Sequence, residues 1–143
     1  MNKLSFALTI AAITAFAAQG QQLGISLLGE KTVAGNQCGA QLSLLTKHQW
    51  CLGAFYQASW QPTNKEQPIT HPFYGVSANA PLIQCDKMNF YFNIRCGVVN
   101  KYFVILAPGL ETELKISKAF SVSSMMSVRM SYPSAMIRAN LKF

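Results

Sequence analysis

The last ten residues of the chain alternate between apolar and polar side chains. The apolar set is Ala135, Ile137, Ala139, Leu141 and Phe143. The intervening set is Met136, Arg138, Asn140 and Lys142. A side-chain period of two predicts a β-strand with one apolar and one polar face. By itself this strand fits the edge of a soluble sheet as well as the closing strand of a barrel.

The same alternation recurs in seven earlier segments, which are separated by turns rich in polar residues or proline. They are residues 23–29, 38–45, 50–60, 73–80, 88–98, 102–116 and 119–132. Short connections between successive strands make them antiparallel neighbours in an up-and-down meander. We expect connections 46–49, 81–87 and 117–118 at the end that carries both termini, and connections 30–37, 61–72, 99–101 and 132–134 at the other. Eight strands are enough to close a small barrel.

Composition bears on which face of such a barrel points outward. Charged residues make up 12% of the chain and hydrophobic residues 50%, whereas soluble domains carry roughly 25% charged residues. A surface this poor in charge favours an apolar face in contact with lipid. The alternative is a soluble secreted or periplasmic lipocalin-like β-barrel, which would turn its apolar face inward around an apolar ligand.

The polar face carries charges of both signs on the fifth to eighth segments. The candidates for ion pairs in the lumen are Arg95, Glu111, Glu113, Lys115, Arg129 and Arg138. An eight-stranded interior is only wide enough to be filled by side chains, and an unpaired charge there is costly. We therefore expect Glu111 or Glu113 to pair with Arg129 or Arg138 and to plug a narrow lumen.

Aromatic residues bracket the apolar face. The candidates for an aromatic girdle are Trp50, Trp60, Tyr74, Phe120, Tyr132 and Phe143. Trp50 and Trp60 bound one segment, and in a strand tilted by ~45° they would stand about 23 Å apart along the membrane normal. A transmembrane barrel carries an apolar band about 25 Å tall between two such girdles. The brackets favour the membrane orientation.

Residues 1–20 have the pattern of a secretory signal peptide. Lys3 precedes an uncharged apolar run from Leu4 to Ala18, and small residues permit cleavage after Gly20 or, as second choice, after Ala17. The apolar run is shorter than the ~20 residues of a spanning helix. We expect residues 21–143 to form the mature domain. Its net charge falls from +7 to +6 when Lys3 is removed, which favours anionic lipid headgroups or lipopolysaccharide over nucleic acid as partner.

With Leu141-Lys142-Phe143 at the end of its last strand, the chain resembles the small eight-stranded outer-membrane barrels of Gram-negative bacteria, of the OmpA and OmpX type. The resemblance covers residues 22–143 as a pattern. It implies an eight-stranded antiparallel up-and-down transmembrane β-barrel in the outer membrane, with recognition of the closing strand by the barrel-assembly machinery. Arg138 and Met136 depart from that signal, in which Gly and a polar residue are favoured. The implied role is structural, adhesive or surface-interacting.

The remaining reactive residues give little support for chemistry. The four cysteines permit disulfides after export, and we expect Cys51 and Cys85 to be the best pair. The chain has no C-x-x-C motif, so no metal site or cofactor is predicted. His48 lies in a turn, and His71 lies in the long loop with Ser77 in the next strand and Glu66 as its only nearby acid. This does not make the complete set of base, orienting carboxylate and nucleophile that catalysis requires, and it favours surface histidines. We therefore expect no enzymatic activity.

Overall fold

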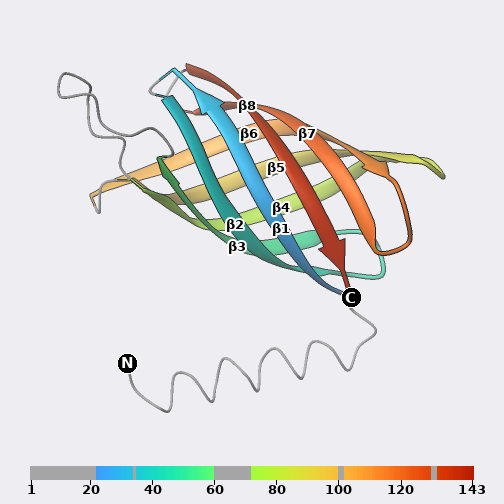
Figure 1. The fold of residues 1–143 in the computed structure, drawn as a ribbon. Helices are drawn as coiled ribbons and strands as arrows, with labels where there is room; N and C mark the ends of the chain where they lie inside the picture. Colours follow the sequence, from blue (N-terminus) through green and yellow to red (C-terminus); the bar gives the residue numbers. More distant parts are fainter. Residues whose placement is uncertain (1–21, 34, 60–71, 100–101, 130–131) are drawn as a thin grey trace, which may run out of the picture.

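The structure is a computed structural model, which describes residues 22–33, 35–59, 72–99, 102–129 and 132–143. These residues form eight β-strands (Figure 1). The strands are β1 (Gln22–Thr32), β2 (Gly35–Leu45), β3 (Cys51–Ser59), β4 (Phe73–Gln84), β5 (Met88–Val99), β6 (Phe103–Lys115), β7 (Phe120–Arg129) and β8 (Tyr132–Lys142). The predicted signal peptide, residues 1–20, lies outside the described residues.

Each strand pairs with its neighbour in the chain, and β8 pairs with β1 to close the barrel. All eight pairings are antiparallel. Leu27 in β1 lies opposite Ala40 in β2 and Ala139 in β8. The outward-facing residues of β1 are therefore paired with outward-facing residues of both neighbouring strands. The predicted eight-stranded antiparallel up-and-down barrel is confirmed.

The barrel has two ends that we name by their place in the chain. At the terminal end, β1 begins, β8 ends, and residues 46–50, 85–87 and 116–119 connect strands. At the opposite end lie the last residues of β1, β5 and β7 and the first residues of β2, β4, β6 and β8.

Polar residues face inward and apolar residues face outward. In β8, Ser134, Met136 and Arg138 are 5%, 2% and 3% exposed, whereas Ile137 and Leu141 are 65% and 47% exposed. Large apolar side chains are exposed on the other strands as well, among them Leu27, Val76, Leu106, Leu110 and Met126. A soluble barrel would place these side chains inside, so the lipocalin-like alternative is wrong. The outer wall is instead the kind of surface that hydrocarbon covers.

Inward glycines allow the strands of this narrow barrel to approach closely. Gly75 and Gly97 lie directly opposite each other in β4 and β5. A Cβ built on Gly75 would meet the carbonyl oxygen of Cys96 and the Cα of Gly97, and one on Gly97 would meet the carbonyl oxygen of Tyr74. Gly35, which opens β2, has a φ of 127°, a conformation that glycine adopts without steric cost.

Three strands extend well beyond the ranges that the sequence predicted. β1 and β2 extend through most of the expected connection 30–37, because Glu30 and Gln37 continue the inward parity. β4 continues past the expected turn at Pro81 as far as Gln84. The register shifts between Pro81 and Ile83, and a bulge of this kind tolerates a proline that cannot donate to the ladder.

No helix within the described ranges has the length and apolar character needed to cross a membrane.

Candidate functional site

The inward side chains form two polar clusters along the barrel axis, and a small apolar layer packs against the cluster nearer the opposite end. The cluster nearer the opposite end is centred on Glu30 and Arg95. Arg95 Nη2 lies 2.7 Å from Glu30 Oε1, and Arg95 Nη1 lies 2.9 Å from Glu30 Oε2. Both side chains are 0% exposed. This bidentate geometry is the strongest arrangement that an arginine and a carboxylate can make.

Two neutral groups also accept hydrogen bonds from Arg95. Its Nη1 donates to Gln57 Oε1 at 3.1 Å, and its Nη2 donates to Ser127 Oγ at 3.1 Å. Ser127 Oγ lies 2.7 Å from Ser134 Oγ. The pair is therefore held by side chains from β1, β3, β5, β7 and β8, so it ties together strands that are not neighbours.

Arg129 stands above this pair, at the opposite end. Its Nη1 donates to Gln37 Oε1 at 2.7 Å and lies 3.9 Å from Glu30 Oε2. Its guanidinium carbon sits 4.1 Å from the centre of the Phe73 ring, within the range of a cation–π contact. Glu30 is thus shared between two arginines, with the closer contact to Arg95.

The apolar layer lies inside the barrel. It consists of Leu28, Phe55, Phe73, Ile105, Met125 and Met136. The rings of Phe55 and Phe73 meet edge to face with centroids 4.8 Å apart, a favoured aromatic geometry. These side chains exclude water around the Glu30–Arg95 pair, and exclusion of water strengthens its electrostatic attraction.

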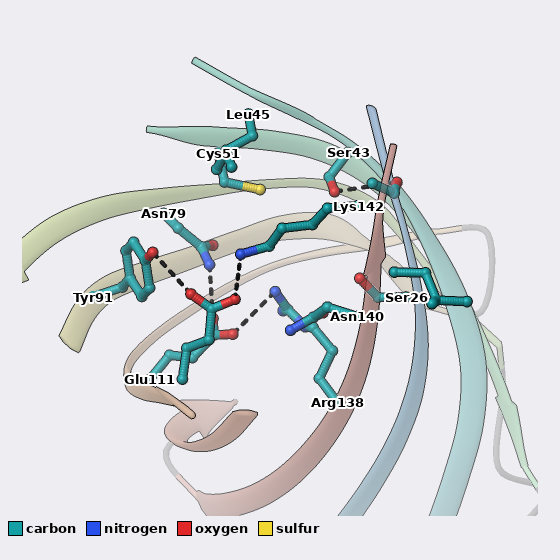
Figure 2. A pocket seen from close by; sticks show the side chains of 13 residues that line it. Ser26, Ser43, Leu45, Cys51, Asn79, Tyr91, Glu111, Arg138, Asn140 and Lys142 are labelled. Atoms are coloured by element: carbon teal, nitrogen blue, oxygen red, sulfur yellow. Dashed lines mark hydrogen bonds and ion pairs between the residues drawn. The ribbon is translucent and has the colours of Figure 1, made fainter. Parts of the chain in front are cut away.

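The second cluster lies nearer the terminal end and is centred on Glu113. Lys142 Nζ lies 2.6 Å from Glu113 Oε1, which also accepts a hydrogen bond from Ser121 Oγ. The other oxygen, Oε2, accepts hydrogen bonds from Tyr91 Oη at 3.0 Å and Asn89 Nδ2 at 3.1 Å. Figure 2 shows Lys142 and Tyr91 directed into this part of the lumen.

Glu111 occupies the next inward position of β6. Its Oε1 lies 3.2 Å from Arg138 Nη1, and its Oε2 accepts a hydrogen bond of 2.7 Å from Asn79 Nδ2 (Figure 2). Asn140 Nδ2 donates to Ser121 Oγ and Ser123 Oγ. The space between these groups is a cavity of only about 40 Å³, enough for one or a few water molecules.

Five of the six predicted lumen charges point into the barrel, and the sixth does not form an ion pair among the described residues. Arg95, Glu111, Glu113, Arg129 and Arg138 all have an acidic or basic partner. Lys115 lies at the rim of the terminal end, where its Nζ donates to the carbonyl oxygen of Cys85 at 3.0 Å. β6 ends at Lys115, so the side chain reaches over the rim and not into the lumen.

Only one of the ion pairs that the sequence predicted for Arg129 and Arg138 is present in the structure. Arg138 is paired with Glu111, as one of the expected combinations requires. Arg129 is paired with Glu30 and Gln37 and not with Glu111 or Glu113, because it lies at the opposite end whereas both glutamates lie nearer the terminal end. Glu30 was missed, although it continues the alternation of the first segment by one step.

The predicted girdle residues lie on the outer surface where they are described. Trp50, Tyr74, Tyr132 and Phe143 are 49%, 38%, 60% and 70% exposed, and Phe120 is half-buried. Trp50, Phe120 and Phe143 lie at the terminal end, and Tyr74 and Tyr132 lie at the opposite end. Trp60 falls outside the described residues. Tyr74 also stacks on Tyr56 with ring centroids 6.4 Å apart.

The predicted disulfide between Cys51 and Cys85 is wrong for this structure, in which all four cysteines are free. Cys51 lies opposite Asn79 in the β3–β4 ladder. Cys85 comes six residues after Asn79 and directly after the end of β4, about 20 Å farther along at ~3.3 Å per residue. A disulfide needs Cα atoms within about 7 Å. The extension of β4 beyond Pro81 is what separates the two residues.

The chemistry of these clusters is that of ion pairing and hydrogen bonding. In the described ranges, no group of three or more histidine, cysteine or acidic side chains is placed to hold a metal ion. The carboxylates of Glu30, Glu111 and Glu113 each face a basic side chain. All three carboxylates are therefore engaged by basic side chains of the barrel interior.

Comparison with known proteins gives a likeness in fold alone. No protein-family description and no curated protein matches the sequence. Among solved structures, the chain is similar to a de novo designed transmembrane β-barrel, with a TM-score of 0.69 and 10% identity over 85% of this chain and 95% of that one. It also matches Neisserial surface protein A with a TM-score of 0.46 and 9% identity, over 85% of this chain and 94% of the other. The first similarity, together with the outward apolar face, gives this chain the fold of a small transmembrane β-barrel.

Proposed function

We propose that this chain is a small outer-membrane β-barrel protein with a structural, adhesive or surface-interacting role and a lumen that is closed to solutes. The observation that carries the proposal is the inverted distribution of polarity. Leu27, Ile137 and Met126 are more than 60% exposed, whereas Glu30 and Arg95 are at most 2% exposed. Water would penalise the outer wall and hydrocarbon would not. The signal-peptide pattern of residues 1–20 supports export before insertion.

The membrane placement is tested by refolding the mature chain into detergent or lipid vesicles. We expect the folded barrel to migrate differently from the boiled protein on a gel, because the closed sheet resists unfolding by detergent. Fractionation should recover the native protein with the outer membrane. A monomer that stays soluble without detergent would contradict the proposal.

The closed lumen is supported by the two ion-pair clusters and by the apolar layer inside the barrel. Arg95, Phe73, Met125 and Met136 have at most 2% exposure, so they occupy the interior and leave little open space. We expect planar-bilayer recordings of the unmodified protein to show no wide, stable pore. Conductance of the size that porins show would refute closure without affecting the membrane placement.

The partners we propose are membrane lipid, lipopolysaccharide and the barrel-assembly machinery. Phe143 supports the last of these, because its ring is 70% exposed and its backbone N–H donates to Leu23 O at 2.8 Å, beside the seam between β8 and β1. Replacement of Phe143 with aspartate should lower outer-membrane levels several-fold, measured by immunoblot. The matched control, Tyr132 to aspartate at the other end of β8, should reduce the level less. Equal losses would mean that the terminal aromatic has no special role.

A further inference from the structure

One glycine on the outer wall is not required by the packing of the barrel. At six glycines in the strands, an added Cβ would come within 3 Å of a neighbouring atom: Gly24, Gly39, Gly53, Gly75, Gly97 and Gly109. At Gly29, nothing lies within 4 Å of that position. Gly29 has the outward parity of β1, so its missing side chain creates space on the surface of the barrel.

Small residues on neighbouring strands enlarge this space into a groove. Gly29 lies opposite Cys38 in β2, and Leu27 lies opposite Ala40 in β2 and Ala139 in β8. The groove has an open volume of about 1300 Å³ and extends from β7 across β8, β1 and β2 to β3, which are successive strands of the closed barrel (Figure 1). Its raised walls are formed by Leu27, Ile137 and Tyr56, which are 67%, 65% and 55% exposed.

A single cation lines the groove near the opposite end. Lys31 has the same outward parity as Gly29 and lies opposite Asn36 in β2 and Ala135 in β8. Lys31 and Asn36 are both exposed and both line the groove. Within the described part of the chain, no carboxylate forms an ion pair with Lys31. A lysine near the edge of an apolar surface can extend its amine toward the headgroup region.

We propose that this groove is a binding site for one anionic lipid, with an acyl chain along Gly29 and Cys38 and the phosphate at the amine of Lys31. The inference rests on the membrane placement proposed above. An apolar channel that ends in a cation complements an amphiphile with a negative headgroup, and lysine binds phosphate as a point charge. Asn36 adds an amide that can donate to the same phosphate.

A second copy of the chain is a poorer occupant of the groove. Two barrels inserted in the same direction can be related only by an axis along the membrane normal. A symmetric interface over this groove would therefore place the two Lys31 side chains at the same height and close together. Like charges that face each other across an interface oppose association.

The test uses the refolded protein in vesicles of equal parts phosphatidylglycerol and phosphatidylcholine, followed by native mass spectrometry of the extracted barrel. We expect the unmodified protein to retain phosphatidylglycerol several-fold more than phosphatidylcholine. Gly29→Leu fills the groove without a clash inside the barrel, and it should reduce bound phosphatidylglycerol at least fivefold. Lys31→Gln should remove the preference for phosphatidylglycerol while leaving some lipid bound.

Ala80→Leu is the matched control, because Ala80 has the outward parity of β4 and lies opposite Phe92, away from the groove. It should leave lipid retention unchanged. Undiminished retention in both Gly29→Leu and Lys31→Gln would overturn the site, as would a lipid-free dimer that Gly29→Leu converts to a monomer. Each variant is first checked for the heat-dependent gel shift. If the variants insert normally but bind lipid like the unmodified protein, the binding site in the groove is refuted and the membrane placement is not. If the unmodified protein never inserts, both the membrane placement and the binding site are refuted.

Discussion

Replacement of Arg95 with methionine should reduce the free energy of unfolding by about 3–5 kcal/mol. Arg95 provides both close contacts to Glu30, at 2.7 and 2.9 Å, and both side chains are 0% exposed. Methionine is close to arginine in length but leaves the buried carboxylate without its bidentate partner. The measurement is urea unfolding of the barrel in lipid vesicles, followed by tryptophan fluorescence.

Two further variants separate the charge effect from the loss of packing. The double replacement of Glu30 with glutamine and Arg95 with methionine removes both charges, and it should cost less than half as much as Arg95→Met alone. Arg129→Met should cost only about 1–2 kcal/mol, since it removes a hydrogen bond to Gln37 and a more distant contact of 3.9 Å. A loss for Arg129→Met equal to that for Arg95→Met would show that Glu30 depends on both arginines alike.

The positions of the strands, and which of their side chains point inward, could be predicted because both depend on a local sequence pattern. A period of two is visible within any single segment, such as Met136 to Lys142, and low charge indicates which face meets lipid. The strand ends were less predictable. Glu30 was assigned to a connection because the apolar residues of its segment stop at Leu28, although the inward parity of Ser26 and Leu28 continues through it.

The ion pair of Glu111 with Arg138, from β6 and β8, was among the expected combinations, whereas the pair of Glu30 with Arg95 was not. Glu30 and Arg95 are separated by 65 residues and come from β1 and β5, strands on different sides of the barrel. Which of their side chains meet across the lumen depends on strand tilt and stagger, and these are properties of the closed barrel. The same limit explains the disulfide error, because the distance between Cys51 and Cys85 depends on how far β4 continues past Pro81.

The apolar layer in the lumen was missed for a related reason. Phe55 and Met136 share the parity of polar residues in their strands, so their inward direction could be read from the sequence. Their contacts could not be predicted from the sequence. Phe55 meets Phe73 and Met136 approaches Arg95 only after the sheet closes. The resulting layer packs around the Glu30–Arg95 pair.

Replacement of Gly75 with alanine should strongly impair folding of the barrel. The added Cβ would meet the carbonyl oxygen of Cys96 and the Cα of Gly97, which are backbone atoms of the paired strand β5. Backbone atoms cannot rotate away as a side chain can, so β4 and β5 must separate there. The expected loss is about 3 kcal/mol or more, from strain and weakened ladder hydrogen bonds.

The matched control is Gly29→Ala, which adds the same methyl group to a strand position where nothing lies within 4 Å. This variant should be neutral or more stable by up to about 1 kcal/mol, because alanine restricts the unfolded chain more than glycine does. Both variants are compared by urea unfolding in vesicles and by the fraction that shows the heat-dependent gel shift. If Gly75→Ala folds as well as Gly29→Ala, then β4 and β5 do not approach as closely as the structure places them. The barrel would then be wider than the structure shows at the opposite end, where Gly75, Gly97 and Phe73 meet.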